Sequence, residues 1–143
     1  MGKHLLYIQI ALLALLFYFG NLERILSNIP LAILFMAGTT LALWAFYNMG
    51  SKNYSPFPQP RSAGKFTQKG AYKYMRHPMY TGVLLIAAAL LLSNFYFPSF
   101  IVFAALAYVL DEKATLEENL LVKMHPEYKN YLPKTRKFIP FVY

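Results

Sequence analysis

The sequence contains no cysteine, which excludes disulfide bonds and thiolate-ligated metal centres. Charged residues are also scarce: they make up 14% of the 143 residues, against roughly 25% in an average soluble domain. Only six side chains are acidic, and four of these lie in residues 111–118. Hydrophobic residues supply 57% of the chain. This composition argues against an ordinary soluble domain and predicts a single-domain, all-α integral membrane protein.

The signatures of several common sites are missing as well. No G-x-G-x-x-G motif follows a strand, and the chain has no P-loop, no H-E-x-x-H and no G-x-S-x-G. The three histidines, His4, His77 and His125, lie far apart in the sequence. We therefore predict no Rossmann-type cofactor site, no serine-hydrolase site and no metal site.

Long uncharged runs are present instead. Leu5–Phe19 is apolar apart from Gln9, and Ile29–Tyr47 carries no charge. A helix that spans a bilayer needs about 20 mostly apolar residues. Both segments are therefore predicted to be transmembrane helices, although the first is somewhat short.

A third uncharged run, residues 79–110, is too long for one ordinary span. It contains the turn-forming stretch SNFYFPS at residues 93–99. We therefore expect a short helical hairpin with arms at Tyr80–Leu92 and Phe100–Leu110. The second arm is expected to continue into an amphipathic cytoplasmic helix over Asp111–His125, where Lys113 and Glu117 have the spacing of an ion pair.

The net charge of +8 is distributed unevenly along the chain. With a cytoplasmic N-terminus, Arg24 is the only basic residue outside, whereas the basic residues of the 48–79 loop, including Arg61 and Lys65, and those of the C-terminal tail are all inside. This asymmetry predicts a multi-pass protein of the cytoplasmic membrane with both termini in the cytoplasm. The positive charge is then attracted to membrane lipids with anionic headgroups, and nucleic acid is not an expected partner.

We predict a single structural domain that consists of a two-helix membrane anchor, residues 1–47, and a region, residues 48–143, that carries nearly all of the polar chemistry. Prolines at positions 56, 58 and 60 favour an extended path between the two regions. This loop is either a tether along the headgroups or a lid over a site. After Pro126, the chain forms a turn and then a basic, aromatic tail.

Two polar clusters flank the predicted hairpin. Arg76 and His77 precede Pro78, which suits the first position of a helix, and Glu117 and Glu118 follow the second arm. Because a hairpin returns to the side that it left, the two clusters are expected to face each other across one cavity. Taken separately, the same residues also fit interfacial anchors, a helix start and a solvated helix face.

Three ordered motifs resemble the isoprenylcysteine carboxyl methyltransferase and phospholipid methyltransferase superfamily. They are GAYKYMRHPMYTG at residues 70–82, EENLL at 117–121, and HPEYKNYLPKTRKFIP at 125–140. Ala71 stands where the superfamily usually has proline, and His125-Pro126 stands where it usually has glycine. The resemblance covers residues 54–140 and implies methyl transfer from S-adenosylmethionine to a lipophilic acceptor.

The resemblance also implies roles for individual residues. It implies a cofactor pocket formed by Tyr72, His77, Pro78, Tyr80, Gly82, Glu117, Glu118, Tyr128 and Tyr131. Arg76 and Glu117 are the implied catalytic residues. A carboxylate acceptor needs no base and could be held by Arg76, whereas an amine acceptor, such as a phospholipid headgroup, must lose a proton to Glu117 or His77.

Two other functions fit the same region. Sterol reductases, which bind NADPH, resemble this C-terminal region but usually have a much larger helical bundle. A non-catalytic membrane scaffold could also retain the shape of the pocket.

Overall fold

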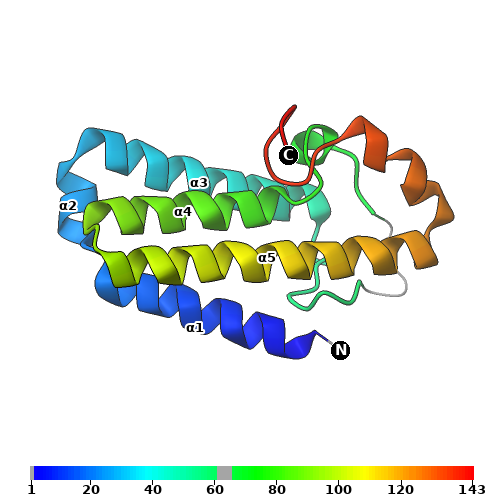
Figure 1. The fold of residues 1–143 in the computed structure, drawn as a ribbon. Helices are drawn as coiled ribbons and strands as arrows, with labels where there is room; N and C mark the ends of the chain where they lie inside the picture. The colour runs from blue at the N-terminus through cyan, green and yellow to red at the C-terminus, as the bar shows by residue number, and fades with distance from the viewer. Residues whose placement is uncertain (1, 61–65) are drawn as a thin grey trace.

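The computed structural model describes residues 2–60 and 66–143, in which the regular secondary structure is helical (Figure 1). The α-helices are α1 (Lys3–Phe19), α2 (Leu22–Ser27), α3 (Ile29–Met49), α4 (Pro78–Ser93) and α5 (Phe97–Met124). Three 3₁₀-helices are η1 (Gly70–Lys73), η2 (Pro126–Asn130) and η3 (Leu132–Lys134). The prediction of an all-α fold is confirmed. Arg61 and Lys65, which the charge pattern assigns to the cytoplasm, lie outside the described residues.

The helix ends follow local signals in the sequence. The Asn21 side chain accepts a hydrogen bond from the backbone N–H of Arg24 and caps α2, and the Asn28 side chain caps α3 through Leu31. α1 and α3 fall on the two predicted apolar segments. The short helix α2 between them was not predicted, because six residues are too few to give a clear periodic pattern.

The predicted hairpin is formed by α4 and α5. Pro78 begins α4 as expected, and the turn falls at residues 94–96. The second arm continues to Met124 without a break, which confirms the prediction that it runs on into the amphipathic segment. The expected pair between Lys113 and Glu117 does not form. Lys113 Nζ instead donates to Gln9 Oε1 of α1, 2.9 Å away, because burial against α1 places the ammonium beside this amide.

The four long helices lie side by side in one bundle, with α3 packed along α4 and α1 along α5 (Figure 1). Gly38 and Gly82 allow the closest approach between α3 and α4. A Cβ atom at Gly82 would lie 2.6 Å from the Gly38 carbonyl oxygen, and one at Gly38 would lie 2.7 Å from the Gly82 carbonyl oxygen. Small residues of this kind are typical of helix contacts in membranes.

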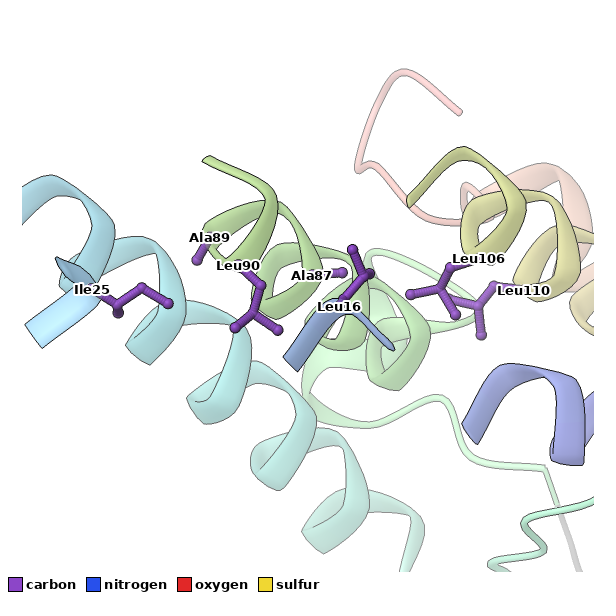
Figure 2. Close-up of a cluster of buried hydrophobic side chains, with 7 residues drawn as sticks. All are labelled: Leu16, Ile25, Ala87, Ala89, Leu90, Leu106 and Leu110. Atoms are coloured by element: carbon purple, nitrogen blue, oxygen red, sulfur yellow. The ribbon is translucent and has the colours of Figure 1, made fainter. Parts of the chain in front are cut away.

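Buried apolar side chains join the helices at mid-bundle (Figure 2). The cluster consists of Leu16, Ile25, Ala87, Ala89, Leu90, Leu106 and Leu110. In lipid, such a cluster stabilises the fold by close packing and van der Waals contact, since lipid tails are as apolar as leucine.

Polar contacts tie the α1–α2 corner to the α4–α5 turn, at the end of the bundle away from the chain termini. Ser93 Oγ accepts from the backbone N–H of Asn21 at 2.8 Å, and Arg24 Nη1 donates to the Ser93 carbonyl at 3.3 Å. Asn94 Nδ2 donates to the Phe19 carbonyl at 2.9 Å. These contacts fix the hairpin turn relative to the N-terminal helices.

Helix α3 is long and apolar enough to cross a membrane, and most of its large side chains point outward. The apolar helices α1 and α4 have 17 and 16 residues. At about 1.5 Å per residue they extend roughly 25 Å, short of the ~30 Å hydrocarbon core. The structure therefore supports one clear candidate span among the described residues, where the sequence predicted two N-terminal spans.

We expect Gly82→Ala to destabilise the protein by about 1–3 kcal/mol, because the new methyl group would overlap backbone atoms of α3. Thermal unfolding in detergent is the measurement. Ala104→Leu, which adds more volume on an exposed face of α5, is the control and should unfold near the wild-type temperature. An unchanged Gly82→Ala melting temperature would contradict the close α3–α4 contact.

Candidate functional site

One end of the bundle holds the N-terminus, the end of α3, the start of α4 and the second half of α5 (Figure 1). Most of the predicted polar site residues belong to segments at this end. The C-terminal tail folds back onto this end. Backbone N–H groups of Arg76 and His77 donate to the carbonyls of Arg136 and Lys137, at 2.8 and 3.1 Å. Lys137 Nζ also bonds Asp111 Oδ1 of α5 at 2.6 Å. The tail is thereby joined to both arms of the hairpin.

The two predicted clusters meet in direct contact. Glu118 Oε1 accepts from Arg76 Nε at 2.7 Å and lies 2.9 Å from His77 Nε2. Tyr80 donates its hydroxyl hydrogen to Glu117 Oε2 at 2.9 Å. The hairpin therefore brings the basic and acidic groups to one place, as the sequence predicted. Glu118, however, bonds the basic residues directly and does not face them across a cavity.

Bonding and stacking fix the position of the His77 ring. The side chain is 5% exposed and stacks on Tyr80, with ring centroids 5.3 Å apart and planes 6° apart. Since an ionised carboxylate can only accept, His77 Nε2 carries the hydrogen that faces Glu118. The other ring nitrogen, Nδ1, lies 3.8 Å from Glu117 Oε2. In the neutral ring, Nδ1 is the free base and it faces Glu117.

The Arg76 guanidinium is largely engaged in holding the protein together. Besides Glu118, its Nη1 donates to the carbonyls of Leu132 and Thr135, at 3.0 and 2.7 Å. Only 14% of the side chain is exposed. Arg76 is therefore a buried tie between α4, α5 and the tail, and the observed burial does not match an interfacial anchor. Within the described residues, Nη2 is the nitrogen left without an acceptor.

The protonation of Glu118 follows from these contacts. Burial on its own would raise the pKa of this carboxyl, but hydrogen bonds from His77 and Arg76 outweigh that effect and hold the pKa below its usual range. Glu118 is therefore ionised near neutral pH, and its negative charge is shared by two donors.

Buried tyrosines form the wall behind the charged groups. Tyr131 donates its hydroxyl hydrogen to the carbonyl of Tyr72, and burial raises the pKa of Tyr131 to about 12. Burial and the nearby Glu117 also raise the pKa of Tyr72. Phe66 packs edge-on against Tyr128, with centroids 5.0 Å apart. These phenols remain neutral and present rings and hydroxyl groups to the interior.

A cavity of about 200 Å³ lies between this wall, the helices and the proline-rich loop. Its polar lining residues include Asn53, Ser55, Thr67, Tyr72, Arg76, His77, Tyr80, Glu117, Tyr128 and Tyr131. Its apolar lining residues include Leu6, Ala42, Met79, Val83 and Leu121. Because Tyr54, Pro56 and Pro60 also line it, the loop covers the cavity, and this position favours the lid interpretation over the tether.

Most of the predicted site residues are brought together here. Seven of them line the cavity: Tyr72, Arg76, His77, Tyr80, Glu117, Tyr128 and Tyr131. Pro78, Gly82 and Glu118 are not among its described lining residues. Gly82 contacts the backbone of α3, Glu118 supports His77 from behind, and Pro78 starts α4.

Among the lining residues that were not predicted as site residues, Gln9 of α1 and Lys113 of α5 stand out because their polar groups contact each other. Gln9 is the one polar side chain in an otherwise apolar segment, and Lys113 precedes Glu117 by one helical turn. Each of these signals was visible in the sequence. The contact between them was not, since 104 positions separate the two residues.

Comparison with known families gives one decisive result. Residues 30–123 match the model described as the isoprenylcysteine carboxyl methyltransferase (ICMT) family. The chain belongs to this family. The match runs from α3 through α5, so α1, α2 and the tail with Tyr128 and Tyr131 lie outside it. A comparison with curated proteins gave no match.

ICMT family membership has direct consequences for the cavity. The family consists of membrane-associated, S-adenosylmethionine-dependent methyltransferases. The matched segment contains the RHPMY motif, the whole hairpin and both glutamates. The cavity where these elements meet is therefore the candidate active site.

We expect Glu118→Gln to destabilise the fold by about 1.5–3 kcal/mol near neutral pH, since it weakens two charge-assisted hydrogen bonds. Because the folded-state pKa is depressed, this stabilisation is present above the ordinary glutamate pKa of about 4.3 and is lost as the pH falls through the lower folded value. Melting temperatures measured in detergent at a series of pH values check this.

Wild type and Glu118→Gln should therefore differ most at neutral pH and converge in acid. Glu112→Gln, which removes a carboxylate from an exposed position of the same helix, should follow wild type throughout. A constant difference between wild type and Glu118→Gln at every pH would show that the carboxylate charge is not what stabilises the fold.

Proposed function

We propose that the protein is a multi-pass integral membrane methyltransferase that transfers the methyl group of S-adenosylmethionine to a lipid or lipidated acceptor. The observation that carries the proposal is the position of Glu117. Its carboxylate lines a cavity that also has many apolar lining side chains, and it lies beside stacked aromatic rings. One cavity thus combines a carboxylate and aromatic rings, which suit a cationic methyl donor, with apolar side chains, which suit a lipid chain.

The residues present fit the chemistry of the cofactor. Sulfonium and ammonium groups favour carboxylates and aromatic faces, which Glu117, Tyr72 and Tyr80 provide. Phe66, Tyr128 and Tyr131 provide further ring surface for the adenine base. When bound, S-adenosylmethionine supplies an electrophilic methyl group. Pro78, Gly82 and Glu118 would support the cofactor site without lining it. Pro78 and Gly82 fix the position of α4, and Glu118 fixes the His77 ring.

Positioning is the main contribution of the protein to a direct displacement of this kind. The tie from Glu118 to His77 and Arg76, together with the stack on Tyr80, holds the rings that line the cavity. Apolar side chains and residues 54–60 of the loop line the cavity, so we expect a reacting anion to be less solvated there than in water. A carboxylate acceptor would then react without a base.

An amine acceptor would need to lose a proton before it reacts. His77 Nδ1 and Glu117 are the two groups placed to receive it, because both face the same part of the cavity. Arg76 is less suited to bidentate binding of an acceptor than the sequence suggested, since Nε and Nη1 already have protein acceptors. Its remaining Nη2 could still contact an acceptor.

We also propose that both termini and the loop face the cytoplasm. The two termini lie toward the same end of the bundle as the start of α4 (Figure 1), whose first residues line the cavity together with residues 54–56 of the loop. The cytoplasm is where a soluble cofactor is supplied. The arrangement agrees with the positive-inside distribution of basic residues.

Glu117→Gln should weaken binding of S-adenosylhomocysteine more than about tenfold, or ~1.4 kcal/mol, because it removes the charge that attracts the amino group. Isothermal titration in detergent measures this, with Glu112→Gln as the matched control. Normal binding by folded Glu117→Gln would exclude a role for this carboxylate. Wild-type binding of NADPH but not of S-adenosylhomocysteine would contradict the proposed function.

Labelled S-adenosylmethionine incubated with the protein and native membrane lipids should give a methylated product that partitions into organic solvent. Mild alkali then identifies the acceptor: a methyl ester releases labelled methanol, whereas an N-methyl group is stable. His77→Ala should reduce formation of an alkali-stable product at least tenfold if His77 is the base. Label that appears only in water-soluble products would contradict a lipid acceptor.

A further inference from the structure

Lys113 is a buried cation that lines the cavity. The residue is 2% exposed, and its ammonium group donates to Gln9 Oε1 at 2.9 Å. Nζ also lies 5.1 Å from the centroid of the Tyr80 ring. Lysine is almost never fully buried without a partner of opposite charge.

The partners of Lys113 leave its charge without a counterion. An amide oxygen and an aromatic face each carry only partial negative charge. Among the described residues, no carboxylate lies within ion-pair distance of Nζ. Glu117, one turn along the same face of α5, acts on the ammonium group only from beyond ion-pair distance, and its carboxylate accepts from Tyr80. A buried ammonium group of this kind is costly unless an anion is also present.

Lys113 and Glu117 line the same cavity from successive turns of α5. Gln9 and Leu6 line it from α1, Ala42 from α3 and Val83 from α4. At ~1.5 Å per residue, the two charged positions on α5 are about 6 Å apart along the helix. The cavity therefore presents a carboxylate and, one turn nearer the start of α5, an ammonium group.

We propose that Lys113, oriented by Gln9, binds an anionic group of the methyl acceptor, either a carboxylate or a phosphate, and that α1 is thereby part of the acceptor site. This inference deepens the proposed function and rests on it. A cationic donor is attracted to Glu117 and an anionic acceptor to Lys113. The two ligands therefore bind at adjacent positions, the donor nearer Glu117 and the acceptor nearer Lys113. Uncharged lipids would leave the ammonium group unpaired and would bind less tightly.

A purely structural role for the Gln9–Lys113 contact makes a different prediction. If the contact only joins α1 to α5, Gln9→Glu should preserve it or strengthen it, because a carboxylate pairs with an ammonium group. If Lys113 binds an anion, the same change supplies a competing carboxylate and weakens anion binding. Gln9→Glu therefore separates the two roles.

The experiment measures equilibrium binding to the full-length protein in a nonionic detergent without cofactor. Two matched pairs of probes are used: N-acetyl-S-farnesylcysteine with its methyl ester, and oleoyl lysophosphatidate with monooleoylglycerol. Wild type should bind the anionic member of at least one pair tenfold or more tightly, and that pair identifies carboxylate or phosphate as the group bound. Lys113→Met and Gln9→Glu should each lose this preference.

The control is Lys123→Met, which removes the same charge from an exposed position of α5 and should keep the wild-type preference. Equal binding of both members of both pairs by wild type would overturn the inference. Retention of the preference in folded Gln9→Glu, or its loss in Lys123→Met, would also overturn it. If Lys113→Met does not fold, Gln9→Glu alone decides.

S-adenosylhomocysteine binding is measured in parallel and should be unchanged within about threefold in the control, Lys123→Met. A wild-type protein that prefers the anionic lipid but does not bind S-adenosylhomocysteine would refute the proposed function and leave the anion site standing. The two failures are therefore distinguishable.

Discussion

The contact on which the site depends is the pair of hydrogen bonds that Glu118 accepts from Arg76 and His77. It joins the second half of α5 to the residues just before α4, so it closes the hairpin at the end opposite its turn. Arg76 extends the same contact to the tail through two backbone carbonyls. Replacing Glu118 with alanine would leave donors of Arg76 and His77 without their acceptor. An unpaired donor in a largely buried place destabilises the fold by more than the net contribution of the hydrogen bond itself.

Residues on successive turns of α5 have different roles. Leu106 and Leu110 pack in the apolar cluster, Lys113 and Glu117 reach the cavity, and Glu118 supports the ring of His77. A single uninterrupted helix fixes the spacing of these groups. The position of the carboxylate relative to the lipid-facing part of the bundle is therefore set by helix geometry and does not depend on the conformation of a loop.

Much of this arrangement could be predicted from local patterns in the sequence. Apolar length predicted α1 and α3, and the breakers around residues 93–99 predicted the hairpin turn. The return of a hairpin to its starting side then predicted that the basic and acidic clusters would meet. The site residues taken from motifs mostly line one cavity, because the motifs flank the hairpin at the end where its arms reconverge.

Contacts that depend on precise distances between helices could not be predicted from local patterns. Gly82 was assigned to the cofactor pocket, but its place is explained by the close backbone approach of α3. Arg76 was expected to contact the acceptor, yet carbonyls of the tail occupy much of its guanidinium. Both residues lie in the motif, but only the packed structure distinguishes a residue that lines the cavity from one that supports it.

The first helix, α1, also contributes residues that line the cavity. It carries no motif and lies outside residues 30–123, which match the family. Even so, Leu6 and Gln9 line the cavity from α1. Most of its polar lining residues, in contrast, lie in the matched segment. If Lys113 and Gln9 bind the acceptor as we propose, the groups that suit the methyl donor come largely from the matched segment, and part of the acceptor site comes from a helix outside it. Gln9 is the residue by which the apolar segment of α1 differs from a wholly apolar membrane anchor.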